Sequence, residues 1–159
     1  MGTTYTEADF DRLSWHDCHI WAIGFAVGNP TDEDWTHGLA FDIDFIVEWL
    51  RPSADKLQFR VAPAKLVFHG VTDPRINVDW GDSGFQVAMR GVSIADISRE
   101  LVRHQKVHLD RPYYKWRVLL NWPDGEIVFG AVGFTQTLLG DPVLTDKQHL
   151  SPMERSPGR

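Results

Sequence analysis

Bulky and polar side chains alternate along residues 38–50 of the chain. One set of alternating positions holds Leu39, Phe41, Ile43, Phe45, Val47 and Trp49, and the other holds Ala40, Asp42, Asp44, Ile46, Glu48 and Leu50. A period of two residues is typical of a β-strand with one dry face and one mostly wet face, whereas a helix would scatter the large residues around its circumference. The pattern therefore predicts a long central strand.

Similar patterns predict further strands over residues 14–27, 57–69, 75–80 and 85–92. In the first of these, Asp17 and His19 fall on the same strand face. In the second, Pro63 cannot donate a backbone hydrogen bond, which favours a position at a sheet edge or a bulge.

Two segments have helical features. Thr6 and Asp9 have the spacing of a capping box, which predicts a short helix over residues 7–13. Residues 93–104 fit either a helix capped by Ser93 or a strand, and the pattern leaves both open.

A hairpin is predicted where Pro123-Asp124-Gly125 separates two apolar segments, residues 113–122 and 126–138. The turn would place Trp122 opposite Glu126, Leu120 opposite Val128 and Trp116 opposite Val132. Both faces of this hairpin carry apolar residues near the turn, so a second layer or a subunit contact is expected to cover them.

Together these elements predict a mainly β, single-domain protein, with antiparallel sheet forming a half-open barrel or a two-layer sandwich and one or two short helices. The domain is expected to span residues 1–139. Proline, serine and charged residues dominate residues 140–159, which predicts a loosely ordered C-terminal extension.

Charge and cysteine content narrow the function classes. The net charge of the 159 residues is −6 and the pI is about 5.6, which argues against nucleic acid as a partner because phosphates require a basic face. Cys18 is the only cysteine and falls on a predicted strand face of mostly small apolar residues, so we expect an inert core thiol and a cytoplasmic, reducing location. No apolar run approaches the length of a membrane span, and no signal peptide is expected.

One combination of residues has the chemistry of a metal or catalytic site. Asp42 and Asp44 repeat on the central strand the spacing of Asp17 and His19. If the two strands pair in register, one imidazole and three carboxylates would converge as ligands for zinc, manganese or iron. His19, with Asp17 beside it, would then be the candidate general base.

A structural interpretation of the same residues carries more weight. Asp42, Asp44 and Glu48 would form the wet face of the sheet, paired with Arg60, Lys65 or Arg75 on neighbouring strands. On this interpretation the protein needs no cofactor.

Other candidates are more isolated. His104 and His108 have a spacing that binds metal only on a helix. Trp35, which lies in an acidic loop, and Glu48 are candidate contact residues for a partner.

Several segments resemble a family of small bacterial proteins that has no assigned activity. The segments are Ser14-Trp15-His16-Asp17 with His19-Ile20, residues 41–49, residues 59–69, Asn121-Trp122-Pro123-Asp124-Gly125-Glu126-Ile127 and Gly133-Phe134-Thr135-Gln136. The resemblance covers most of residues 14–139. It implies a bacterial, cytoplasmic protein and transfers no activity to any residue.

The favoured function is therefore a non-catalytic recognition protein, which binds another protein or a small ligand through an acidic, aromatic surface. An antitoxin- or immunity-type role against a basic partner is one version. The alternatives are a metal-dependent enzyme using Asp17, His19, Asp42 and Asp44, and a homodimer whose interface is the two-faced hairpin. No glycine-rich phosphate loop or serine-nucleophile elbow supports nucleotide-dependent or hydrolase chemistry.

Overall fold

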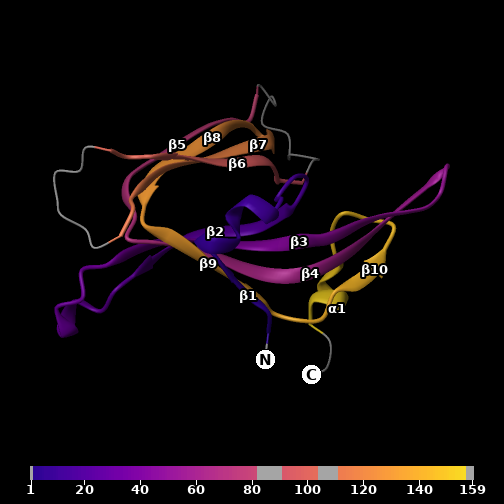
Figure 1. Ribbon diagram of the computed structural model, residues 1–159, viewed down its shortest axis with the longest axis horizontal. Helices are drawn as coiled ribbons and strands as arrows, with labels where there is room; N and C mark the ends of the chain where they lie inside the picture. The colour runs from indigo at the N-terminus through magenta and orange to yellow at the C-terminus, as the bar shows by residue number, and fades with distance from the viewer. Residues whose placement is uncertain (1, 82–90, 104–110, 157–159) are drawn as a thin grey trace.

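The computed structural model describes residues 2–81, 91–103 and 111–156, which form a mainly β domain (Figure 1). The strands are β1 (Thr4–Thr6), β2 (His19–Val27), β3 (His37–Ser53), β4 (Lys56–His69), β5 (Thr72–Asp79), β6 (Ser93–Leu101), β7 (Tyr114–Trp122), β8 (Asp124–Ala131), β9 (Gly133–Leu138) and β10 (Val143–Thr145). The short helices are the 3₁₀ helices η1 (Glu7–Arg12) and η2 (Pro30–Asp32) and the α-helix α1 (Pro152–Arg155). The predicted fold class is confirmed.

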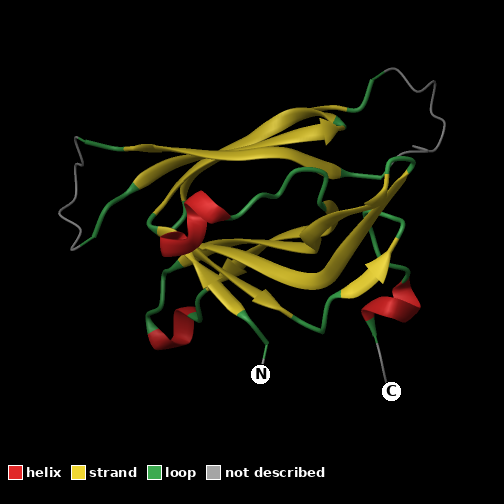
Figure 2. Cartoon of the chain, turned by 45° about the vertical axis from the view of Figure 1, so that its right-hand side comes forward, coloured by secondary structure: helices red, strands yellow, loops and turns green. Residues whose placement is uncertain are grey.

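All ten strands belong to one antiparallel sheet in the order β1-β9-β4-β3-β2-β6-β7-β8-β5, with β10 paired to β4. The sheet does not close into a barrel. It bends so that β5 to β8 lie over the half formed by β2, β3, β4 and β9 (Figures 1 and 2). Aromatic side chains fill the space between the halves: the ring of Phe68 on β4 lies 5.0 Å from that of Trp116 on β7 and 4.8 Å from that of Phe129 on β8.

The predicted central strand is β3, which lies between β2 and β4. Its alternation holds from Leu39 to Phe45, whose inward side chains are buried. A bulge between Ile46 and Glu48 then shifts the pattern by one residue, so Trp49, predicted to point inward, is 41% exposed. Such an insertion reverses the faces of every residue beyond it, which a strict alternation could not predict.

Pro63 does not place its strand at a sheet edge, because β4 has neighbours on both sides, one of which is β3 along nearly its whole length. On the other side of β4, β9 pairs with residues from Ala64 onward and β10 pairs with residues up to Val61. Pro63 lies at the change between these two neighbours, and its carbonyl accepts a hydrogen bond from Leu139 N at 2.7 Å. The missing N–H therefore falls where the ladder is already interrupted.

The strand predicted over residues 14–27 begins only at His19. Asp17 has a φ of 63°, in the left-handed region, and Cys18 N donates to Trp15 O at 3.0 Å to close a turn. The alternation predicted that Asp17 and His19 share a strand face. This prediction is wrong, because Asp17 lies in the turn before β2. A second irregularity between Ile20 and Ala22 leaves Trp21 outside the regular pairing with β3.

Other local predictions have mixed outcomes. The predicted N-terminal helix is the 3₁₀ helix η1, where the Asp9 carboxylate accepts a hydrogen bond from Thr6 N at 2.8 Å. The ambiguous segment after Ser93 is strand β6. The strand predicted over residues 85–92 lies mostly outside the described residues.

The predicted hairpin is present as β7 and β8, but the predicted register between its strands is wrong. Trp116 pairs with Phe129 and Leu120 with Gly125, which differs from the prediction by three positions. Gly125 also pairs with Val78 of β5, and a Cβ at this glycine would lie 2.2 Å from the backbone oxygen of Asn77. Strand β5 therefore lies directly against the turn. The second predicted strand of the hairpin ends at Ala131, and the residues that follow form β9, which pairs with β4.

The predicted loose extension is, over residues 143–155, packed against the sheet. Strand β10 pairs with residues Phe59, Arg60 and Val61 of β4. Leu150 is fully buried, and α1 follows it beside the sheet (Figure 1). The composition predicted mobility, but it could not reveal that Leu150 and Arg155 have specific partners on β3. Among the described residues, no helix has the length and apolar character needed to span a membrane.

Candidate functional site

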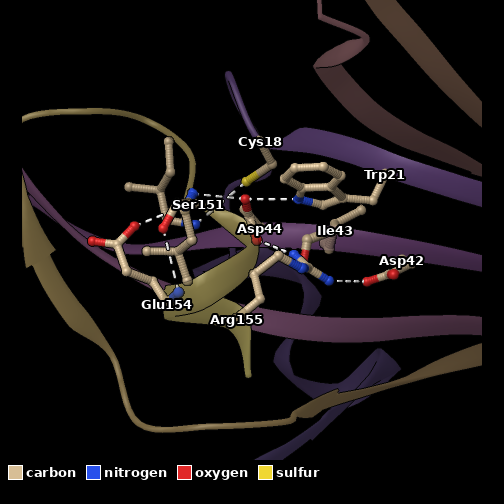
Figure 3. A network of polar contacts seen from close by, with 10 residues as sticks. Cys18, Trp21, Asp42, Ile43, Asp44, Ser151, Glu154 and Arg155 are labelled. Carbon is tan, nitrogen blue, oxygen red and sulfur yellow. Dashed lines mark hydrogen bonds and ion pairs between the residues drawn. The ribbon is translucent and has the colours of Figure 1, made fainter. Parts of the chain in front are cut away.

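A buried carboxylate organises the outer face of β3 (Figure 3). Asp44 is 0% exposed, although its position in the alternation predicted a wet surface. Its Oδ2 accepts hydrogen bonds from Trp21 Nε1 and from Leu150 N, both at 2.8 Å, and its Oδ1 pairs with Arg155. The C-terminal segment and the β2 bulge thus cover Asp44 and supply its donors.

Arg155 completes this cluster. Its guanidinium contacts both Asp44 and Asp42, which point from the same face of β3 because they are two residues apart. The centre of the guanidinium lies 5.1 Å from the ring of Trp21, and the Arg155 side chain is only 13% exposed. Two carboxylates and an aromatic face together form an environment that suits the planar, delocalised cation of arginine.

The segment that carries Arg155 is held by a local cap. Ser151 N donates to Glu154 Oε2 at 2.7 Å, and Glu154 N donates to Ser151 Oγ at 3.3 Å. The hydrogen bond from Ser151 N lowers the pKa of Glu154. This Ser-Pro-x-Glu capping box, with Pro152 at the first helical position, was the sequence signal that could have revealed α1.

The four predicted metal-site residues divide into different contacts. Asp42 and Asp44 bind Arg155, while Asp17 accepts hydrogen bonds from Asn121 Nδ2 at 2.8 Å and from Gln148 Nε2 at 2.9 Å. Within the described ranges, no three His, Cys, Asp or Glu side chains gather as metal ligands. The predicted candidates His104 and His108 lie outside those ranges.

His19 lies opposite Asp44 in the pairing of β2 with β3. Its ring is 4.8 Å from that of Trp21 and 5.8 Å from that of His149, which precedes Leu150. Burial lowers the pKa of His19, and the nearby His149 and Arg155 lower it further, while Asp44 raises it. The cluster therefore contains a histidine that resists protonation.

This shift predicts a pH-dependent stability. Because the pKa of His19 is lower in the folded than in the unfolded protein, the unfolded chain binds more protons just below pH 6.5, and stability is lost as the pH falls through that value. His19→Gln should weaken the loss, measured as urea midpoints between pH 5 and pH 8. His37→Gln, at an exposed position of β3, is the control, and an unchanged slope in His19→Gln would contradict the assignment.

Two further predicted residues are placed clearly. Cys18 is fully buried, and burial raises the pKa of its thiol to about 12. The thiolate is the reactive form, so this cysteine is an inert core residue, as predicted. Glu48 pairs with Arg60, with its Oε2 3.1 Å from Arg60 Nε, which confirms that predicted ion pair.

A second feature is an apolar cleft at the open side of the bent sheet. Its volume is about 300 Å³, and its walls come from Ile23 on β2 and from Ile76 and Val78 on β5, with Trp80 just after β5. Buried Leu120 and Ile127 form its floor. The alternation predicted that Ile76, Val78 and Trp80 share one side, and the structure confirms it.

Exposed apolar residues continue beyond this cleft. Phe25 is 64% exposed, Val27 66% and Trp35, near the end of the β2–β3 hairpin, 71%. Strand β2 pairs with β6 only at His19 and Ser93, so in the part of the chain that the structure describes its edge beyond Ile20 has no neighbour except β3. Among the described residues, a part of the β2 edge that has no second neighbour therefore lies beside a row of exposed apolar side chains.

Comparison with known proteins gives no relative: no family model, no curated protein and no solved structure matches this chain.

Proposed function

We propose that this protein is a non-catalytic recognition protein that binds an extended segment of a partner polypeptide along β2. The segment would add to the free edge of β2 through backbone hydrogen bonds and place alternate side chains in the apolar cleft. This mode of binding derives affinity from the backbone and specificity from the pockets.

The observation that carries the proposal is that, within the described residues, the unpaired part of the β2 edge coincides with exposed apolar side chains. Ile23, Phe25 and Val27 lie two residues apart on β2 and share one face, and Ile23 lines the cleft opposite Ile76. Soluble proteins usually protect a free edge with lysine, proline or a covering loop. Residues 20–27 contain neither lysine nor proline, which favours an edge used for binding.

Charge supports a basic partner. The chain carries a net charge of −6, and exposed Asp32, Glu33 and Asp34 lie near the end of the β2–β3 hairpin. Such a field steers a positively charged partner and excludes an acidic one. An antitoxin- or immunity-type protein is one version of this function, and the lone buried Cys18 together with the bacterial resemblance supports a bacterial, cytoplasmic setting.

Selection from a displayed library of random peptides, followed by titration of synthetic winners, tests the proposal. We expect selected peptides to alternate apolar and basic residues and to bind more weakly as salt rises. Ile23→Lys should weaken binding at least about tenfold, because the lysine would place a charge in the cleft. Leu57→Lys is the matched control, since Ile23 and Leu57 are both 39% exposed and Leu57 lies at the start of β4.

Two outcomes would contradict the proposal. Equal binding by Ile23→Lys and Leu57→Lys would place the peptide elsewhere. A stable dimer in native mass spectrometry that Ile23→Lys dissociates would show that a second copy of this chain, rather than a foreign partner, occupies the edge of β2.

A further inference from the structure

We infer that Asp42, Asp44 and Trp21 form a second binding site, specific for an arginine side chain, and that Arg155 occupies it as an intramolecular ligand. A partner segment that carries arginine would bind there by displacing residues 150–155. This site lies on the outer face of β3 and shares Trp21 with the lining of the apolar cleft.

The first argument is the shape and chemistry of the site. Asp42 and Asp44 each contact a different terminal nitrogen of Arg155, Nη2 and Nη1 respectively, and Nη1 also lies 3.4 Å from the backbone oxygen of Ile43. The Trp21 ring faces the same cation, while its Nε1 fixes Asp44. A lysine ammonium could not reach both carboxylates with separate planar donors. The site therefore selects a guanidinium group.

The second argument concerns Asp44. A carboxylate that is fully buried costs several kcal/mol of desolvation unless a cation and hydrogen-bond donors compensate it. Trp21 remains as a donor when the C-terminal segment leaves, but Leu150 N and Arg155 do not. When the segment leaves, Asp44 loses these two partners and is left to water or to another cation, and an arginine from a partner fits the place that Arg155 vacates.

The third argument concerns the occupant. Helix α1 has four residues, fewer than an isolated helix needs to be stable in water. Its order depends on Leu150 and Arg155, which bind to the same carboxylate. Between these two anchors residues 151–154 are exposed, and a segment near a chain end opens at a smaller free energy than the central strands, so exchange with a partner segment is accessible without global unfolding.

Release of the segment in the full chain tests this inference. In the double variant Leu150→Asp/Arg155→Ala, the intramolecular ligand is disabled. A synthetic peptide with the sequence of residues 148–156 should bind this variant at least tenfold more tightly than it binds the wild-type protein, where the attached segment competes. The same peptide with alanine at the arginine position should not bind. Fluorescence anisotropy of a labelled peptide measures both.

A second measurement covers the case in which the double variant does not fold. The single variant Arg155→Ala should regain thermal stability in millimolar ethylguanidinium chloride, whereas Arg60→Ala, which removes an exposed ion pair, should not. Equal peptide binding by variant and wild type, binding that does not need the arginine, or no selective effect of ethylguanidinium would overturn the inference. None of these outcomes depends on the β2 edge, so the two proposals fail separately.

Discussion

Replacing Asp44 by alanine should destabilise the protein by about 3 kcal/mol or more, a loss comparable to that caused by removing one partner of other buried ion pairs. Asp44 is 0% exposed and accepts hydrogen bonds from Trp21, Leu150 and Arg155. In the variant, the Arg155 guanidinium, the Trp21 Nε1–H and the Leu150 N–H all lose an acceptor that water cannot easily replace. The midpoint of urea unfolding measures the change.

Asp42→Ala is the matched control for this prediction. Asp42 lies on the same strand face and binds the same arginine, but its side chain is 44% exposed. The pair that remains, Arg155 with Asp44, is the buried one, so the loss should stay at about 1 kcal/mol or less. Equal losses in the two variants would show that Asp44 does not organise the cluster. Asp44→Asn, which keeps an acceptor but removes the charge, should fall between them.

The strands that could be predicted from the sequence are those whose pattern is local. The alternation of β3 and β4 reflects one buried face, because the apolar or polar character of each position indicates whether that side chain is buried. Their positions agree with the prediction to within a few residues at each end, whereas their pairing with each other was not predicted. The bulge beyond Ile46 and the turn at Asp17 leave no such pattern, because one inserted residue changes the faces without changing the composition.

The sequence predicted the carboxylates of the candidate site but not the cation that they contact. The alternation placed Asp42 and Asp44 on one strand face, and both contact Arg155, but the expected cations were Arg60, Lys65 and Arg75. The residue opposite Asp44 on β4 is Pro63, which carries no charge. The cation that contacts Asp44 is Arg155, 111 positions further along the chain. A contact of that sequence separation requires the fold itself, since no periodicity connects the two residues. The capping box at Ser151 predicts a helix but not where that helix lies.

The tryptophans show what composition alone cannot predict. Composition counts seven of them and cannot say which are packed and which are available to a partner. The structure separates them: Trp116 is 0% exposed at the centre of the core, whereas Trp35 is 71% exposed. The local pattern already separates these two, because Trp35 follows three acidic residues in a loop whereas Trp116 lies in an apolar strand segment, but it does not show which face of that strand is covered.

Trp116→Ala should therefore cost about 3–5 kcal/mol, the range for removing a large aromatic side chain from a core. The Trp116 ring contacts those of Phe68 at 5.0 Å, Phe10 at 5.5 Å and Phe134 at 5.9 Å, and its Nε1 donates to Ala131 O at 3.2 Å. These partners come from β4, η1 and β9, so the substitution removes the side chain that joins the two halves of the bent sheet.

Trp35→Ala provides the comparison for the same urea experiment. An exposed side chain on a loop contributes little to folding, and its loss should change stability by no more than about 0.5 kcal/mol. If Trp35 is a contact residue, its substitution should weaken the binding of selected peptides while the unfolding midpoint stays constant. Unfolding midpoints that move equally in Trp116→Ala and Trp35→Ala would mean that the halves of the sheet do not depend on Trp116 for their packing. A large difference would instead locate stability at Trp116 and leave the surface around Trp35 free for recognition.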